Sequence, residues 1–521
     1  PHTLYFGANV LFKSADRGET WHAVSPDLTH CTPDRLEASG GPITHDITNA
    51  ETYCTVYAIA EDPADAKTLW IGTDTGYVDV TRDGGATWNE STLPGVPAGQ
   101  SRISNLSASP SQSGTAYVSV DRHEWNDPAP HAFATHDFGK TWRRIDAGLD
   151  GYVHVVREDP RNRDVLYAGT ERGMFLSFDR GAHWQPFNLG LPAVPVYDLQ
   201  VHPRDNDLIV GSHGHGFYVL DDLTPIQQYG RVNGTAAYVF TPMPATRFAA
   251  GFSRESGRGE FVAPSKPEGA ALTFYLATTP KAPPKGKPTA RVRVYDGAKL
   301  IDEFQTPAHA GLNRAVWNLR TLPPGGMSTP QDTRSYYVFY PMRNYGPKVS
   351  PGEYTIEVAN GDPSARANVT VRMDPKHPAS AADLRAQADA LNRLSVAQAD
   401  GERAIFELNA MQKKLAPYRS RRDAIGDQAR ATDERVAGLL DRLRNPESSG
   451  YRQPARPVEQ LGYLRHTIEQ FDGAPTAAQN AAIDACAKQI AAVNQDRTTL
   501  LAEDLESLNR LLSEARLPRI S

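Results

Sequence analysis

Two histidines separated by one glycine, His213 and His215, are the residues of this sequence that most directly suggest metal chemistry. Side chains two positions apart in a β-strand point to the same face, so both imidazoles could bind one metal ion. Glycines flank both histidines and would allow a close approach of the backbone. The alternative is that the His-Gly-His run simply ends a strand. Further ligands could come from the pairs His45–Asp46 and His123–Glu124.

Acidic residues in the same part of the chain could supply the carboxylates for glycoside hydrolysis. That reaction needs two Asp or Glu side chains across one groove, at a separation that depends on whether the enzyme inverts or retains. Each candidate can equally be a solvated loop residue, so the sequence assigns no catalytic residue, and we predict no cofactor. The candidates are Asp46, Asp74, Asp79, Glu124 and Glu171.

An eight-residue pattern that occurs four times indicates what would position these side chains. Its aspartate can accept hydrogen bonds from its own turn, and its glycine supplies a positive φ. Its tryptophan begins the next strand, where we expect the ring to pack beneath the turn. In the fourth copy His183 replaces the usual threonine. The predicted turn residues are Asp16, Gly18 and Trp21; Asp83, Gly85 and Trp88; Asp137, Gly139 and Trp142; and Asp179, Gly181 and Trp184.

These turns belong to a longer repeat that reads strand, Pro turn, strand, Gly turn, strand, aspartate turn, strand. Such a unit is typical of a four-stranded β-propeller blade. We therefore predict propeller blades over residues 1–226, as one partial and four further blades. The first predicted strand, Thr3–Gly7, lies in the middle of a unit, so we expect missing upstream sequence to complete the ring, with five closed blades as the alternative.

The rest of the chain changes character twice. Residues 227–272 contain only short apolar runs and predict a connecting segment. Alternating residues over 273–374 predict an antiparallel sandwich that resembles an immunoglobulin-like module, interrupted by the aromatic loop Tyr336–Tyr340. Residues 378–521 have the apolar period of helices and predict an α-helical bundle, capped at its start by Ser380 with Asp383. The predicted fold class is therefore mainly β, with blades, a sandwich and a C-terminal helical bundle.

Charge and cysteine content limit the class of partner. A formal net charge of -6 over 521 residues argues against non-specific binding to nucleic acid. No run of residues is apolar enough for a membrane helix. Cys31 and Cys54 bracket one polar loop and could form a disulfide or remain two separate thiols, whereas Cys486 lies in a helical pattern.

The four aspartate turns resemble the bacterial neuraminidase (BNR) repeat, also called the Asp-box, of sialidases, xyloglucanases and sortilin. Further similarity extends over Val153–Pro160, Leu220–Pro225, the sandwich and the helices. This resemblance implies an exported protein, periplasmic or secreted, of the sortilin-like or glycosyl-hydrolase-like type. A sialidase would need an arginine triad, and the spacing of Arg102, Arg122, Arg157 and Arg172 marks none.

Two functions follow as alternatives. The first is a scaffold that binds a peptide, protein or glycan ligand on the propeller, with the N-terminal half or a second copy of the chain as a further partner. The second is a glycoside hydrolase with paired carboxylates in the propeller cleft. Because the same fold supports both functions, the fold alone does not choose between them.

Overall fold

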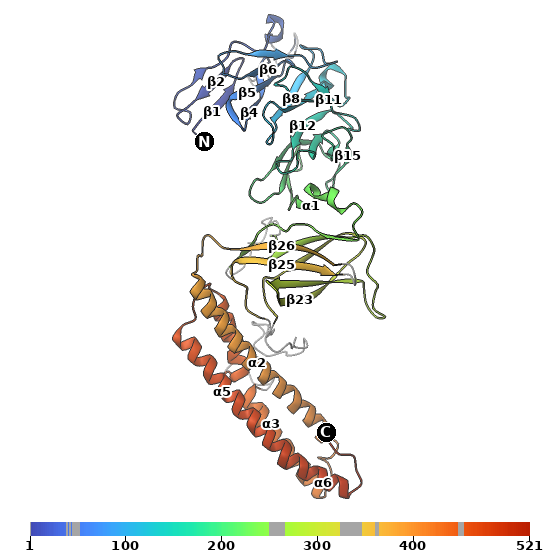
Figure 1. Ribbon diagram of the computed structural model, residues 1–521, viewed down its shortest axis with the longest axis vertical. Helices are drawn as coiled ribbons and strands as arrows, with labels where there is room; N and C mark the ends of the chain where they lie inside the picture. The colour runs from blue at the N-terminus through green and yellow to red at the C-terminus, as the bar shows by residue number, and fades with distance from the viewer. Residues whose placement is uncertain are drawn as a thin grey trace. The chain divides into compact units, whose positions relative to one another are not determined.

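The computed structural model describes residues 2–37, 40, 43, 53–248, 266–322, 346–359, 364–445 and 453–520. The chain divides into two compact units, Pro1–Gly230 and Arg231–Ser521. The described residues of the first unit form small antiparallel sheets, and those of the second form two sheets followed by helices (Figure 1). The prediction of a mainly β chain with a C-terminal helical region is thus confirmed.

Three sheets of the first unit have four strands in sequence order, as the repeat predicts. They are β4 (Val56–Asp62), β5 (Asp65–Thr73), β6 (Val78–Thr81) and β7 (Asn89–Ser91); β8 (Arg102–Ala108), β9 (Ala116–Asp121), β10 (Ala132–Thr135) and β11 (Arg143–Arg144); and β12 (Val153–Glu158), β13 (Leu166–Thr170), β14 (Gly173–Ser177) and β15 (Gln185–Pro186).

Two further sheets, at the beginning and end of this unit, have three strands each. They are β1 (Leu4–Gly7), β2 (Leu11–Ser14) and β3 (His22–Ala23); and β16 (Val196–Val201), β17 (Leu208–Ser212) and β18 (Phe217–Leu220). Short helical turns lie at η1 (Pro33–Leu36), η2 (His123–Trp125), α1 (Thr224–Gln227) and η3 (Tyr229–Val232). Closure of the sheets into a ring stays a prediction.

Neighbouring sheets pack together through shared apolar cores. Trp70 of the second sheet, for example, packs with Ile103 and Phe133 of the third. Close packing requires glycine on the second strand, because a Cβ atom at Gly72 would lie 2.4 Å from Ile103 Cγ2. Gly169 takes the same place before Val196, whose carbonyl oxygen would lie 2.5 Å from such an atom. The Gly-Thr and Gly-Ser ends of these strands therefore let each inner strand approach the preceding sheet.

The aspartate turns are networks of hydrogen bonds that repeat from sheet to sheet. In the third copy, the Gly139 N–H donates to Thr135 Oγ1 at 3.1 Å, and the Thr141 N–H donates to Asp137 Oδ1 at 2.9 Å. The hydrogen bonds from Thr141 lower the pKa of Asp137 to about 2. The glycine of this turn has a φ of 76°, which is the left-handed conformation that the sequence predicts.

Two of the turn tryptophans bond to the preceding sheet, whereas Trp21 Nε1 donates to the Gly18 carbonyl oxygen of its own turn at 3.1 Å. Trp88 Nε1 donates to the carbonyl oxygen of Val24 at 3.0 Å, and Trp184 Nε1 donates to that of Ile145. Both carbonyls follow the outer strand of the preceding sheet. An indole N–H needs an acceptor when it is buried, and the neighbouring sheet supplies one. These two tryptophans therefore join consecutive sheets.

Loss of one turn carboxylate should weaken the first unit. We expect Asp137→Ala to lower its free energy of unfolding by about 1–2 kcal/mol, because two Thr141 donors lose their acceptor. Tryptophan fluorescence during urea unfolding measures the change, since six of the seven tryptophans lie before residue 231. Asp164→Asn, which alters an exposed ion pair with Arg180, is the control. Equal midpoints for Asp137→Ala and the unaltered protein would refute this role.

The second unit begins with two sheets that share one apolar core. The smaller consists of β19 (Ala237–Val239), β21 (Ala270–Leu276) and β24 (Gly311–Trp317). The larger has the order β20 (Ala245–Arg247), β26 (Ser364–Met373), β25 (Gly352–Ala359), β22 (Thr289–Asp296) and β23 (Lys299–Pro307). β20 pairs with β26 in parallel, whereas we expected antiparallel pairing throughout. The immunoglobulin-like assignment stays a prediction, and the loop Tyr336–Tyr340 lies outside the described residues.

Two of these strands lie within residues 227–272, which we predicted to be a connecting segment. β19 and β20 have three residues each and pair with β21 and β26. Strands this short carry no measurable alternation, so the pattern on which strand prediction depends is missing. Val239 and Ala245 are nevertheless buried in the core of the two sheets.

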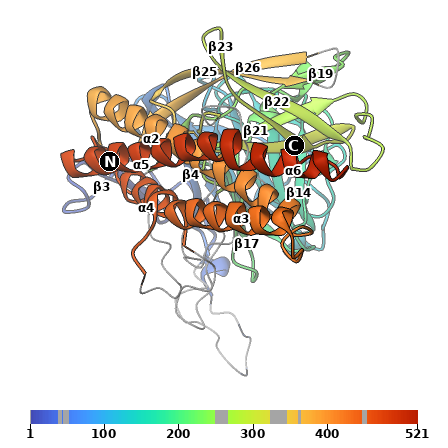
Figure 2. The same cartoon turned by 90° about the horizontal axis from the view of Figure 1, so that it is seen from below.

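The helices of the second unit agree closely with the predicted periodicity. They are α2 (Ala381–Leu415), α3 (Ala424–Leu443), α4 (Pro457–Glu469), α5 (Ala477–Leu500), a π turn η4 (Leu501–Leu505) and α6 (Glu506–Glu514). Figure 2 shows α5 lying along α2, α3 and α4, with which it shares an apolar core. The Ser380 side chain caps α2 by accepting from the Asp383 N–H at 3.1 Å, as predicted. Among the described residues, no helix is both long enough and apolar enough to cross a membrane.

A buried arginine connects the sheets of the second unit to its helices. Arg247 Nη2 lies 2.9 Å from Asp472 Oδ1, and both side chains are nearly inaccessible to solvent. The same guanidinium donates to the carbonyl oxygen of Val349 at 2.7 Å and to Gln387 Oε1 at 2.7 Å. Arg320 makes a second connection through two hydrogen bonds to Glu469, of 2.7 and 2.8 Å.

Candidate functional site

Four β-bulges occupy equivalent places in the first unit and define the candidate site. Each interrupts the pairing between the first and second strand of a sheet near its start, after one paired residue in three sheets and after two in the sheet of β8 and β9. A bulge leaves one residue without a cross-strand partner and redirects its side chain, and bulges are frequent beside functional sites. The redirected residues are Tyr57, Ser104, His154 and Tyr197.

A second set of equivalent positions follows the bulges on the neighbouring strand. The backbone N–H of Asp74 donates to the carbonyl oxygen of Thr55, that of Glu171 to Tyr152, and that of His213 to Pro195. In the third sheet the equivalent residues are Arg102 and Asp121, which lie opposite each other on β8 and β9. The same end of four successive sheets therefore carries Asp74, Asp121, Glu171 and His213.

Contacts between sheets join several of these residues, together with their neighbours, into one cluster. The His154 ring stacks on Tyr197 of the next sheet, with ring centroids 4.0 Å apart. His123 stacks in the same way on Tyr152, at 4.7 Å, and the Arg102 guanidinium lies 5.7 Å from the centre of the Tyr57 ring. We call this set the inner-strand cluster; its members are Tyr57, Arg102, Asp121, His123, Glu124, Tyr152, His154, Glu171, Tyr197 and His213.

Asp121 is a buried but ionised carboxylate at the centre of the cluster. Burial acts to raise its pKa, but hydrogen bonds from His123 and Arg102 outweigh burial and leave the pKa below the usual value. Arg102 Nη2 lies 2.7 Å from Asp121 Oδ2, and Arg102 Nη1 lies 3.1 Å from Glu124 Oε1. The guanidinium is thus shared by two carboxylates.

Glu171 lies beside two neutral groups, His154 and Tyr152. Its Oε2 lies 3.1 Å from His154 Nε2, and burial lowers the pKa of His154, so this imidazole is neutral at neutral pH. Burial and the neighbouring Glu171 raise the pKa of Tyr152 to about 12, so this phenol also keeps its proton. Two tyrosines of the cluster are exposed: Tyr57 is 55% exposed and Tyr197 is 46% exposed.

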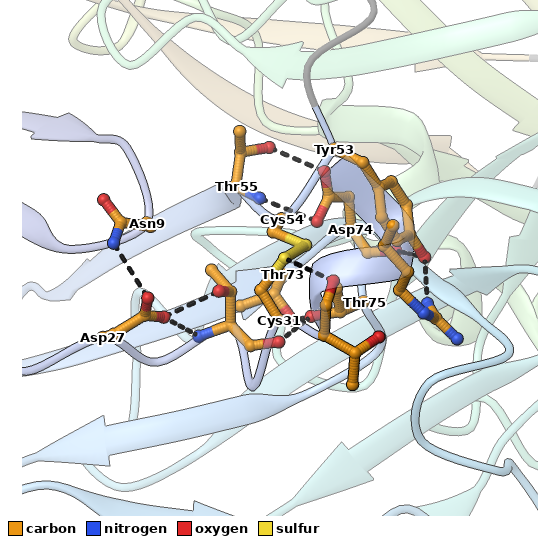
Figure 3. Close-up of a disulfide and its surroundings, with 12 residues drawn as sticks. Asn9, Asp27, Cys31, Tyr53, Cys54, Thr55, Thr73, Asp74 and Thr75 are labelled. Atoms are coloured by element: carbon orange, nitrogen blue, oxygen red, sulfur yellow. Dashed lines mark hydrogen bonds between the residues drawn. A yellow bond between two sulfur atoms is a disulfide. The ribbon is translucent and has the colours of Figure 1, made fainter. Parts of the chain in front are cut away.

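A disulfide holds one edge of the site. Cys31 and Cys54 are bonded, which decides between the two alternatives left by the sequence. Figure 3 shows Cys54 next to Thr55, whose N–H and hydroxyl donate to the Asp74 carboxylate at 2.8 and 2.9 Å. Burial raises the pKa of Asp74 despite these donors. The Tyr53 hydroxyl donates to the Asp74 carbonyl oxygen at 3.1 Å and accepts from Arg35.

The histidines that we considered for metal binding have different neighbours, and their role as metal ligands stays a prediction. Both His213 and His215 are exposed residues of the turn between β17 and β18, and His213 lies against Tyr197 with ring centroids 4.7 Å apart. His123 Nδ1 lies 2.7 Å from Asp121 Oδ1. Within the described ranges, no three His, Cys, Asp or Glu side chains gather in a way that could hold a metal ion. His45 and Asp46 lie outside those ranges.

The remaining candidates are distributed unevenly. Glu124 and Glu171 belong to the inner-strand cluster, whereas Asp79 lies on β6, where burial and then the charge of Glu90 raise its pKa to about 6. Of the four arginines, only Arg102 belongs to the cluster. The others form ion pairs with different carboxylates: Arg122 with Asp127, Arg157 with Asp198, and Arg172 with Asp150.

Several members of the cluster were absent from the sequence analysis as site residues. Tyr57, His154 and Tyr197 each follow the first valine of an inner strand, in Val-Tyr-Ala, Val-His-Val and Val-Tyr-Asp. This repeated position could have identified the three residues as equivalent, but unequal insertions between the repeats concealed it. Asp121 and Tyr152 were missed for a different reason. Each can be recognised as a site residue only from the residue beside it on the adjacent strand.

Comparisons with known proteins add little beyond these observations. No protein family model matches the chain, and no curated protein matches it. Among solved structures, YCF48 bound to D1 peptide aligns at 17% identity with a TM-score of 0.28, over 42% of this chain and 61% of that one. The GH74 enzyme of Niastella koreensis aligns at 15% identity with a TM-score of 0.31, over 72% of this chain and 56% of that one. The chain covers less than two thirds of either structure.

Proposed function

We propose that this chain is an exported β-propeller scaffold that binds a peptide, protein or glycan ligand through the inner-strand cluster. The observation that carries the proposal is the set of four equivalent bulges, at which His154 stacks on Tyr197 of the next sheet and Tyr57 lies near Arg102 of the next sheet. A bulge that served packing alone would not need an exposed tyrosine, yet Tyr57 and Tyr197 are both about half exposed. Exposed aromatic residues with polar neighbours are characteristic of binding surfaces.

Export and family are part of the same proposal. The Cys31–Cys54 disulfide fits an oxidising compartment, either the periplasm or the outside of the cell. The four aspartate turns support assignment to the sortilin-like and BNR-repeat proteins. The helices and sheets of residues 231–521 would then attach the scaffold to a partner or to a second copy of the chain.

Truncation of one exposed ring tests the proposal. The full chain would be applied to arrays of defined peptides and glycans, and we expect Tyr197→Ala to reduce the affinity of the bound class at least about tenfold, as loss of a central aromatic contact does. Phe217→Ala is the matched control, because Phe217 is 84% exposed on β18 and lies outside the cluster. Equal binding by both variants would exclude the cluster as the binding surface.

Glycoside hydrolysis is the second candidate, and the pair Asp121 and Glu171 favours it. Glu171 Oε2 lies 3.1 Å from His154 Nε2, and the charge of Asp121 also acts to raise the pKa of that imidazole. Asp121 is held ionised, as a base or nucleophile must be, and Glu171 would have to supply the proton. Release of reducing sugar from a polysaccharide panel, lost in Glu171→Gln, would establish hydrolysis. Binding of a polysaccharide without release of reducing sugar would exclude hydrolysis and leave binding as the proposed function.

A further inference from the structure

The inner-strand cluster carries more negative than positive charge at neutral pH. Asp121 and Glu124 both pair with the single guanidinium of Arg102, so one negative charge remains on this trio. The charge of Glu171 remains as well, because the His154 imidazole and the Tyr152 phenol beside it are neutral. The glutamate side chains are accessible, at 50% for Glu124 and 35% for Glu171, so a ligand can reach both.

Histidines cover part of two aromatic rings of the cluster, those of Tyr197 and Tyr152. One face of Tyr197 is covered by His154 and another part by His213, with centroids at 4.0 and 4.7 Å. Tyr152 is covered in the same way by His123. A sugar ring stacks on an open aromatic face, and these histidines reduce the face that Tyr197 and Tyr152 can offer. A flexible chain with a charged head needs only the side of a ring and a carboxylate.

The geometry points to a basic peptide segment as the ligand, with a lysine or arginine head bound between Glu171 and Glu124 and its apolar stem beside Tyr197 and Tyr57. This inference rests on the function proposed above and names the ligand class of the same site. The cluster already contains one such contact within the chain, since Arg102 lies against Tyr57 and pairs with Glu124. A ligand cation would provide the compensation that Glu171 lacks.

Fluorescence anisotropy with labelled peptides of equal length tests the inference. The probes are a lysine-rich, an arginine-rich, a glutamine-rich and a glutamate-rich peptide, together with a neutral oligosaccharide. We expect the two basic peptides to bind most tightly and to weaken as salt rises. Glu171→Gln, which keeps the shape of the side chain, should weaken them about tenfold. Asp164→Asn removes the same charge beyond the far end of β12 and should leave the affinity within about twofold.

The outcomes separate this inference from the proposed function. Tighter binding of the glutamate-rich peptide or the oligosaccharide, with loss in Tyr197→Ala, would overturn the cationic ligand and leave the cluster as the binding surface. Binding of the basic peptides that is equal in Glu171→Gln and Asp164→Asn would also overturn the inference. Failure of both basic peptides to bind at about 1 mM would overturn the inference too. Unchanged thermal unfolding of both variants shows that the altered residue, and not the fold, is responsible.

Discussion

Replacement of Arg247 by methionine should lower the free energy of unfolding of the second unit by about 3–5 kcal/mol. Methionine fills a similar volume but leaves the Asp472 carboxylate buried without its cation. The carbonyl oxygens of Lys348 and Val349 and the Gln387 side chain lose a donor at the same time. Far-ultraviolet circular dichroism during urea unfolding reports the effect, because the long helices belong to this unit.

A surface arginine of the same unit provides the control for this experiment. Arg393 pairs with Asp484, and both side chains are about half or more exposed. Arg393→Met should therefore change the unfolding free energy by less than about 1 kcal/mol. The double variant Arg247→Met with Asp472→Asn should recover part of the loss, since no buried charge remains. An effect of Arg247→Met no larger than that of Arg393→Met would show that the buried pair does not hold the unit together.

Removal of the disulfide should have the next largest effect, and it should act on the other unit. The bond closes a loop between residues 23 positions apart, which corresponds to about 3 kcal/mol of stabilisation by restriction of the unfolded chain. We expect the double variant Cys31→Ser with Cys54→Ser to lose that amount. Tryptophan fluorescence measures it, because Trp70, Trp88 and Trp142 all lie in the first unit.

A reducing agent supplies the internal control for the disulfide. Dithiothreitol should destabilise the unaltered protein by the same amount and have no effect on the double serine variant. Because Thr55 and Asp74 lie next to Cys54, ligand binding should weaken together with stability (Figure 3). A double variant as stable as the unaltered protein would contradict the assignment of a structural bond.

Much of the fold could be predicted because its signals are local. The helix α2 begins at Ala381, directly after the predicted cap Ser380, since capping and periodicity are properties of the segment itself. The strands beside the aspartate turns were recognised for the same reason. β19 and β20 were missed because three-residue strands are defined only by the partners to which they bond.

The site was predicted in pieces and not as a whole. Asp74, Glu171 and His213 were all candidates, but nothing in the sequence indicated that they occupy one position in successive sheets. That equivalence depends on strand register, and each bulge shifts the register by one residue. The hypothesis that His213 and His215 bind one metal ion assumed that both lie on one strand, whereas β17 ends at Ser212.

Chemical labelling of tyrosines with and without bound ligand tests the central claim most directly. With the tightest-binding probe at saturation, mass spectrometry should find that Tyr57 and Tyr197 become protected, whereas Tyr229, which is 42% exposed in the same unit, reacts as before. Protection of Tyr229, with Tyr57 and Tyr197 still fully reactive, would place the ligand elsewhere and contradict the account.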